Sequence, residues 1–320
     1  MSTLPGSRER LASPAAGVAA PRAAEGDSYG RGVAMVLGAT LFWSLAGVIV
    51  RLMDAAAGWE IAFWRALTLG ITILVVVAFR YRSRLLVTCR QAGWPALAAG
   101  FFSAFAGMFY LLSLQHITVA NALFMSGFSP LVAAMVGRWF LGEPVAPATW
   151  VAMGIALVGI GVMVDGAVAL GRLGGNMLAL CSSICFGLFG VMLRRGRQID
   201  MMPSILASAL ITTLVAGGVL LARGIAVGDA AAGFSITMHD LLLCCFLGAV
   251  QQAVGTTLFT RGARSVPAAQ LQLFATCEML LGPTWAWLVV SEVPAGTTLI
   301  GGGLVLLAML VQGRYRNRPP

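Results

Sequence analysis

Charged side chains are scarce in this sequence, and lysine is missing altogether. Only 10% of the 320 residues are charged, whereas 59% are hydrophobic, and all 21 basic residues are arginine. A soluble domain normally carries about 25% charged residues. The chain therefore has too few charges to cover a water-facing surface, which excludes an ordinary soluble domain and indicates a membrane protein.

The sequence also lacks the motifs of several classes of enzyme. It has no GxxxxGK[ST] loop, so nothing supports ATP-driven transport by this chain. It has no HExxH motif, and no paired aspartates or serine with histidine inside an apolar run. Cys181 and Cys185 lie one helical turn apart without a nearby histidine or carboxylate, which is typical of small buried side chains. We expect no enzymatic activity, no metal and no cofactor.

The apolar residues form long runs. Because a helix needs about 20 mostly apolar residues to cross a bilayer, these runs predict an all-α integral membrane protein with ten transmembrane helices. The predicted spans are approximately 32–53, 60–79, 93–114, 118–140, 147–165, 174–194, 203–222, 240–260, 267–290 and 295–313. Residues 1–31 and 314–320 flank them as polar tails, the first of which is predicted to be disordered.

The arginines predict the orientation of these spans. Of the 21 arginines, 17 lie in the tails and in alternate loops, 3 lie in the opposite loops, and Arg65 lies inside the second span. Cytoplasmic loops carry the excess of basic residues, so both termini are expected in the cytoplasm, in a bacterial inner membrane. The net charge of +9 is also typical of nucleic-acid-binding proteins, but the arginines lie in small groups between apolar runs rather than on one domain face, which argues against a nucleic-acid partner.

The chain also resembles itself. A shift of 149 residues brings Glu143 onto Glu292 and Leu131 onto Leu280 without a gap. The two halves would be 32–165 and 174–313, each with five helices, and an odd number makes the second half enter the membrane from the opposite side. Inverted repeats are the architecture of secondary transporters. A non-transporting scaffold would not need them.

Short motifs within these halves resemble a known family, the EamA-type ten-helix branch of the drug/metabolite transporter superfamily. They are Phe42-Trp43-Ser44 with Arg51, Phe63-Trp64-Arg65, Ser129-Pro130, Leu141-Gly142-Glu143-Pro144, Glu278 and Ser291-Glu292. The resemblance implies a secondary transporter, commonly an exporter, of small polar metabolites such as amino acids. It departs from the family at Met279, where a proline is usual, so that any kink there must come from elsewhere, with Pro283 as the candidate.

Three polar side chains are candidates for the transport site. Glu278 is the one carboxylate deep within a predicted span, where a charge costs about 2.5–3.5 kcal/mol, so it is a candidate substrate-amine ligand or proton carrier. Its structural alternative is a protonated or hydrogen-bonded glutamate. Gln251 and Gln252 lie in the middle of the eighth span and either line a cavity or join helices. Adjacent residues point about 100° apart, so we expect only one of them to face the cavity.

Three further residues complete the predicted site. Trp43 in the first span and Tyr110 in the third are amphipathic and either line the pathway or pack in the core. Arg65 either binds a substrate carboxylate or has a structural role, by extending outward to the interface or by pairing with another side chain. We expect Glu278 to face a central cavity between the halves, with the other candidates near it.

The nature of the substrate leaves alternatives open. The expected partners are a small-molecule substrate and the lipid bilayer, while proton coupling and a homodimer are both compatible with the sequence. A carrier of lipid or lipid-linked substrates is the second hypothesis, because a laterally open groove cannot be recognised from sequence. A non-transporting scaffold is the third.

Overall fold

The computed structural model describes residues 21–291, apart from 57, 82–84, 118, 146, 165–172 and 230, together with 300, 303, 304, 307, 308 and 311. All the regular structure in these residues is helical. The helices are α1 (Pro21–Trp43), α2 (Leu45–Arg51), α3 (Gly58–Tyr81), α4 (Leu85–Ser113), α5 (Val119–Ser126), α6 (Ser129–Val136), α7 (Pro147–Val164), α8 (Leu173–Arg195), α9 (Met202–Ala226), α10 (Met238–Phe246), α11 (Ala253–Gly262), α12 (Ala268–Ala275) and α13 (Glu278–Val290). Shorter turns are the π-helical η2 (Gly137–Leu141) and η4 (Leu247–Gln252) and the 3₁₀ turn η3 (Ala232–Phe234).

Six helical stretches within the described ranges are long and apolar enough to cross a membrane. They are Ser28–Arg51, Gly58–Arg80, Val87–Ser113, Gly174–Arg195, Met202–Ala226 and Met238–Gly262. They correspond to the predicted spans one to three and six to eight. The fifth corresponds to α7, the fourth and ninth are each divided in two, and most of the tenth lies outside the described residues. The all-α membrane class is confirmed, and the number ten remains a prediction.

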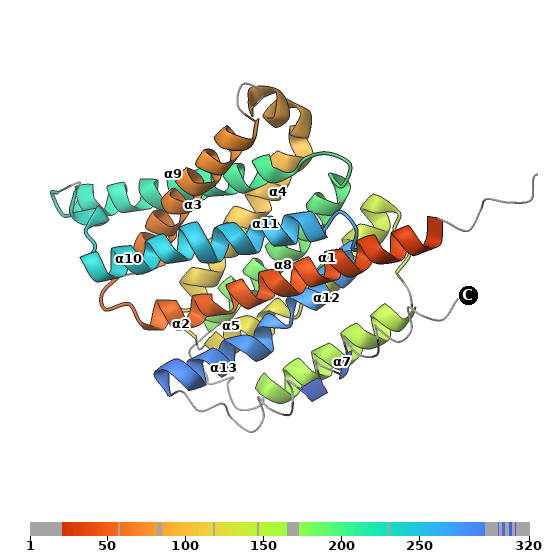
Figure 1. Ribbon diagram of the computed structural model, residues 1–320. Helices are drawn as coiled ribbons and strands as arrows, with labels where there is room; N and C mark the ends of the chain where they lie inside the picture. The colour runs from red at the N-terminus through yellow and green to blue at the C-terminus, as the bar shows by residue number, and fades with distance from the viewer. Residues whose placement is uncertain are drawn as a thin grey trace, which may run out of the picture.

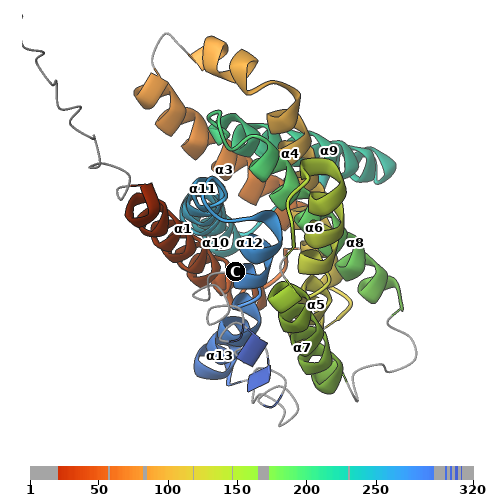
Figure 2. The ribbon, with the colours of Figure 1, turned by 90° about the vertical axis from the view of Figure 1, so that its right-hand side faces the viewer.

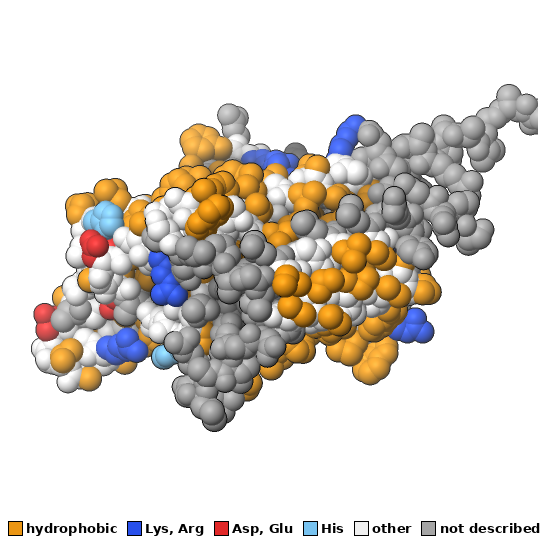
Figure 3. Space-filling model, turned by 90° about the horizontal axis from the view of Figure 1, so that it is seen from below, with side chains coloured by type: hydrophobic (Ala, Val, Ile, Leu, Met, Phe, Trp, Pro, Cys, Tyr) orange, Lys and Arg blue, Asp and Glu red, His pale blue; other side chains and the backbone are white. Residues whose placement is uncertain are grey.

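The outer surface has the apolar character that a lipid environment requires. Large hydrophobic side chains point outward from several spans, among them Phe79 at 82% exposed, Leu214 at 65% and Leu97 at 64%. Hydrophobic side chains cover most of the described surface in the middle and right of the face shown in Figure 3, whereas the visible acidic and histidine side chains gather at its left end. An apolar surface of this extent would be unstable in water and marks contact with a bilayer.

The helices of the two halves interleave. The third helix of the first half, α4, packs along α8 and α9 of the second half, and α1 packs along α11 (Figures 1 and 2). Small residues allow this close approach: a Cβ on Gly100 would lie 2.8 Å from the carbonyl oxygen of Ser204. Close packing through small residues is the usual way that helices associate in lipid. The core is therefore shared by both halves rather than divided between them.

The first helices of the two halves, α1 and α8, run in opposite directions. Gly32, near the start of α1, lies against Gly262 and Val266 just at and beyond the end of α11. Arg194, near the end of α8, donates a hydrogen bond of 2.7 Å to the carbonyl oxygen of Arg264 in the same region. Thus α8 ends where α1 begins, as expected for an inverted repeat.

The fourth and ninth predicted spans are both broken in the middle. α5 ends at Ser126 and α6 begins at Ser129, while α12 ends at Ala275 and α13 begins at Glu278. The breaks correspond under the shift of 149 residues, since Ser129 and Glu278 are equivalent. The expectation that Pro283 produces the second kink is wrong, because Pro283 lies inside α13, five residues beyond its start. The helix is interrupted here by a tight turn without proline, in which Cys277 N–H donates to the carbonyl of Phe274, three residues earlier, at 3.2 Å.

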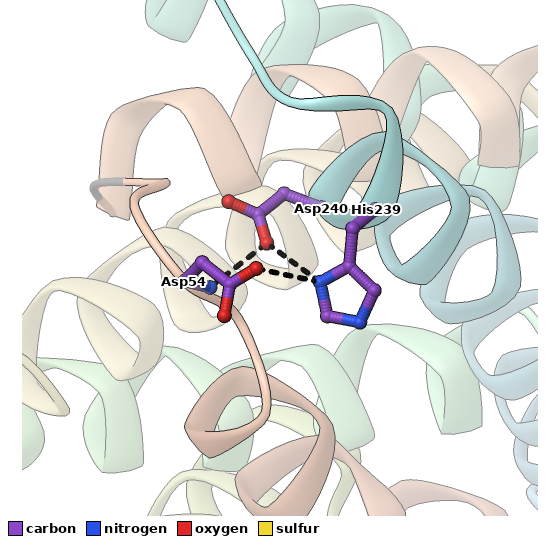
Figure 4. Close-up of side chains that lie close together, drawn as sticks. All are labelled: Asp54, His239 and Asp240. Atoms are coloured by element: carbon purple, nitrogen blue, oxygen red, sulfur yellow. Dashed lines mark hydrogen bonds and ion pairs between the residues drawn. The ribbon is translucent and has the colours of Figure 1, made fainter.

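The end of the molecule opposite to the start of α1 is stabilised by a buried carboxylate. Asp240 at the start of α10 is 0% exposed and accepts the backbone N–H groups of Asp54, Ala55 and Ala56 at 2.9, 3.1 and 3.0 Å. His239 Nδ1 lies 3.2 Å from an Asp54 carboxylate oxygen and 3.4 Å from Asp240 Oδ1 (Figure 4). The three groups could be read as metal ligands. Because both oxygens of Asp240 already accept N–H groups, we interpret the cluster as a structural link between the loop before α3 and α10.

Candidate functional site

A cavity of about 100 Å³ lies between the two halves, and every site residue predicted from the sequence lines it. The candidates that line it are Trp43, Arg65, Tyr110, Gln251, Gln252 and Glu278. They come from α1, α3, α4, η4 and α13, so that both halves contribute.

The two halves contribute equivalent positions to this cavity. Under the shift of 149 residues, Ser103 corresponds to Gln252 and Ser129 to Glu278, and all four residues line it. Under the smaller shift of 143 residues that aligns the first helices of the halves, Trp43 corresponds to Phe186, which also lines it. A cavity lined by equivalent positions lies on the pseudo-twofold axis that relates the repeats. This is where the substrate sites of inverted-repeat transporters are found.

Glu278 is the first residue of α13, and the break in the ninth span brings it into the cavity. Its side chain is only partly exposed, and it forms no hydrogen bond or ion pair with any other residue that the structure describes. The start of a helix carries a partial positive charge that favours an anion. The chain therefore places a carboxyl group without a protein partner at the cavity wall.

Arg65 is the cationic counterpart in the same cavity. It is only 7% exposed, so it does not extend outward to the interface, which was one of the two expectations for it. Gly107 makes room for it, because a Cβ at that position would lie 2.9 Å from Arg65 Nη2. No described carboxylate forms an ion pair with its guanidinium. Tyr110 lies close enough to Arg65 and Glu278 for both charges to act on its hydroxyl group.

We expected only one of the two glutamines to face the cavity; both are among its lining residues, but only Gln252 is partly exposed. They occupy the end of η4, whose π-helical turn changes the angular spacing of successive side chains. The Gln251 amide donates to the carbonyl oxygen of Trp43 at 3.2 Å, and Gln251 is 1% exposed. Gln252 donates to Thr256 Oγ1 at 3.1 Å and remains partly exposed. Gln251 therefore joins helices, and Gln252 is the amide that a ligand can reach.

Trp43 adds an aromatic wall. It is 7% exposed, and its ring contacts that of Phe186 edge to face at a centroid distance of 5.5 Å. The indole fits because position 255 is glycine: a Cβ there would collide with Trp43 Nε1. That indole nitrogen has no hydrogen-bond partner in the described part of the chain. The wall thus offers aromatic rings to the cavity, while the indole N–H is buried against Gly255 of α11.

Several lining residues were not anticipated from the sequence. They are Ser103, Ser126, Ser129, Ser182, Phe186 and Phe189. Serine and phenylalanine are common in membrane helices and carry no signal alone. The internal repeat could have identified two of them, because Phe186 is equivalent to Trp43 and Ser129 is equivalent to Glu278.

Side-chain contacts join the halves on the side of the cavity where α1 begins. Glu143 accepts a hydrogen bond of 2.6 Å from Arg194 Nε, and its second oxygen accepts the Ala268 N–H at 3.3 Å. Glu143 follows η2 in the first half, and it therefore binds the start of α12 in the other half. Between this pair and the cavity, Gln272 donates to the carbonyl oxygen of Phe186 at 2.6 Å.

A two-repeat bundle of apolar helices, with a cavity lined by both repeats, is the architecture of membrane transporters, and comparison with known proteins agrees. The sequence matches the EamA-like transporter family twice, over residues 30–164 and 173–313. The chain belongs to this family. It is a multi-pass membrane protein of the transporter class and not an enzyme.

Individual relatives are more distant. A riboflavin transporter of Rhizobium johnstonii is 26% identical over 298 residues, which cover 88% of this chain and 93% of that protein. Protein RarD of Streptomyces exfoliatus is 28% identical over 240 residues, 74% of this chain and 73% of that protein. A crystal structure with 18% sequence identity superposes with a TM-score of 0.70 over 90% of this chain and 99% of that one. The crystal structure supports the fold alone.

Proposed function

We propose that this protein is a secondary exporter of small zwitterionic metabolites, such as amino acids. The observation that carries the proposal is the pair formed by Arg65 and Glu278. Both line one cavity, they bear opposite charges, and neither has an ion-pair partner among the described residues. An ionised group removed from water is strongly unfavourable unless it is paired. A substrate with one carboxylate and one amine supplies both missing partners.

Arg65 and Glu278 would each bind a different group of the substrate. The guanidinium of Arg65 can bind a carboxylate through two parallel hydrogen bonds, a geometry that an ammonium group does not offer. Glu278 accepts hydrogen bonds from a substrate ammonium group, or it carries a proton when the site is empty. Tyr110 lies near both and orients the substrate between them.

A second candidate substrate is a planar heteroaromatic compound such as riboflavin. Two observations favour it: rings of Trp43, Phe186 and Phe189 line the cavity, and a relative of 26% identity is named as a riboflavin transporter. Flat rings stack on aromatic side chains, and the amide of Gln252 can bond to ring carbonyl groups. This candidate leaves the two charges without partners, so we rank it second.

The proposed mechanism is alternating access. Because equivalent positions of two oppositely directed halves line the cavity, a small rotation of one half against the other would expose it to each side in turn. The Glu143–Arg194 contact would open when the cavity opens toward the end where α1 begins. We assign that end to the cytoplasm of a bacterial inner membrane, since Arg31, Arg80 and Arg264 lie there and belong to the arginine-rich set of tails and loops in the sequence.

Efflux from proteoliposomes tests this function. Vesicles would be loaded with labelled amino acids, riboflavin or a fluorescent lipid analogue and followed with and without a pH gradient. We expect saturable efflux of one or more amino acids, and a gradient dependence would add proton coupling. Arg65→Gln should lower kcat/KM about 10- to 100-fold, because a hydrogen bond to a charged group contributes about 1.5–3 kcal/mol.

The control is Arg223→Gln, which removes an arginine at the exposed end of α9, outside the cavity. It should transport as the wild type does. If Arg65→Gln also abolishes the preference for an amino acid over its decarboxylated amine, the guanidinium binds the carboxylate. Efflux of riboflavin or lipid, with no amino acid moved, would contradict the proposed substrate class.

A further inference from the structure

A second pocket lies apart from the transport cavity, where several helices end. Its volume is about 250 Å³, and it is partly open to solvent. α3 ends at Tyr81, α11 ends at Gly262 and α9 begins at Met202, and all three ends are close to it. Figure 2, which faces this end of the molecule, shows α11 beside α1 and α3. The pocket shares no lining residue with the transport cavity.

Arginine dominates its lining. Four guanidinium groups converge from separate parts of the chain: Arg31 on α1, Arg80 on α3, Arg261 on α11 and Arg264 just beyond α11. One carboxylate is found among the described lining residues, that of Asp200, which lies 3.5 Å from Arg264 Nη2. Arginine is therefore the predominant charged side chain of the described lining.

The remaining lining residues suit a ligand that is polar at one end and apolar at the other. Ser28 and Ser265 add hydroxyl groups, whereas Met35 and Met202 add flexible apolar side chains. The level is that of the helix ends, where the headgroups of a bilayer lie. Basic pockets between transmembrane helices at this depth suit anionic headgroups.

We propose that this pocket binds a phosphate group, presented by an anionic phospholipid or by a soluble phosphate compound. The planar guanidinium matches two phosphate oxygens at once, and several arginines around one pocket can share a single phosphate. Because α1 and α3 belong to the first half and α9 and α11 to the second, a bound phosphate would bridge the halves. Its occupancy would favour the arrangement of the halves seen here over one in which these helix ends separate.

Native mass spectrometry of the full-length protein tests the site. The protein would be purified in detergent with equal amounts of phosphatidylglycerol and phosphatidylcholine, and the ratio of the bound lipids would be measured. We expect a preference for phosphatidylglycerol in the wild type. Each arginine near an anionic surface contributes about a fivefold change in binding, so Arg80→Gln with Arg261→Gln should lower that preference about 25-fold.

The matched control is Arg51→Gln with Arg223→Gln, which removes the same charge at the opposite helix ends. It should keep the preference for phosphatidylglycerol. Replacing Arg80 and Arg261 with lysine instead should cost less than replacing them with glutamine, which separates loss of charge from misfolding. Equal losses in the pocket and control variants would overturn the proposal.

A second arm separates the two sources of phosphate. Inorganic phosphate would be added to protein that has bound phosphatidylglycerol. Retention of the lipid at millimolar phosphate identifies a lipid site, while displacement in the wild type identifies a site for soluble phosphate compounds. Binding of neither phosphatidylglycerol nor phosphate would overturn the proposal.

Discussion

The breaks in the fourth and ninth spans show how two equivalent regions can share a backbone and differ in chemistry. Each interrupts a membrane helix at the same point of its repeat, and each opens a new helix with a residue that lines the cavity. The first begins with Ser129-Pro130, and the second with Glu278-Met279. Proline is well suited to the first turn of a helix, so Pro130 is compatible with the start of α6. The second break has no proline at its equivalent position, yet it too separates two helices by two residues.

The comparison separates the shape of the site from its charge. Shape is common to both repeats and does not depend on proline. Thr276 illustrates how the second break is maintained, since its hydroxyl donates to the carbonyl oxygen of Leu273 at 2.6 Å and so competes with regular helix bonding. Charge at the equivalent cavity position is confined to the second repeat, in Glu278. The two halves can therefore rock as equals and bind a polar substrate asymmetrically.

The largest effect on transport should come from substituting Glu278, compared with its equivalent Ser129. Glu278→Gln keeps the shape and removes the charge, so transport should fall about 10- to 100-fold, as expected for a lost charge-assisted hydrogen bond. Ser129→Ala removes only a hydroxyl that lies 3.4 Å from Gln272 Oε1, and transport should stay within about threefold. The measurement is the efflux rate per reconstituted molecule. Equal losses in both variants would mean that the charge does not distinguish the halves.

An intermediate effect should come from the helix that packs on the first break. A Cβ on Gly187 would lie 2.8 Å from the carbonyl oxygen of Ser129, a backbone atom that cannot move aside. Gly187→Ala should therefore lower the free energy of unfolding by about 1–3 kcal/mol, as overpacking does. In the control Gly218→Ala, the new methyl group has no neighbour within 4 Å. Thermal unfolding in detergent would compare them, and equal stability would argue against tight packing at the break.

The smallest effect should come from the proline itself. If the second break forms without proline, Pro130→Ala should leave the first break in place and change the free energy of unfolding by less than about 1 kcal/mol. Transport should remain above half of the wild-type rate. A large loss of transport with normal stability would show that the first break, unlike the second, depends on its proline.

Much of the fold could be predicted because it depends on hydrophobic length and on the repeat. The six long spans follow from apolar runs that are long enough for a bilayer, and the position of Glu278 follows from the cost of a buried carboxylate. The breaks could not be predicted in the same way. Residues 267–290 are uniformly apolar apart from a few polar positions, so hydropathy gives no sign that the helix stops at Ala275 and starts again at Glu278.

The side chains that line the cavity were predictable in part. Trp43, Arg65, Tyr110 and Glu278 stand out because large polar or charged groups are costly in lipid. The orientation of Gln251 relative to Gln252 depended on the π-helical turn, which no residue pattern announces. The burial of Arg65 depended on Gly107 in another helix, a tertiary contact that local sequence does not contain.

The central claim is that equivalent positions of the two halves form one substrate site, and cysteine accessibility tests it most directly. Ser103→Cys and Gln252→Cys would be made separately in a protein whose six native cysteines are replaced, and treated with a membrane-impermeant maleimide. Leu210→Cys, at a position 58% exposed on the apolar surface of α9, is the lipid-facing control. We predict that both cavity cysteines react, that a transported amino acid slows both reactions, and that the control does not react. Protection of only one cavity cysteine, or of neither, would contradict a site shared by the two repeats.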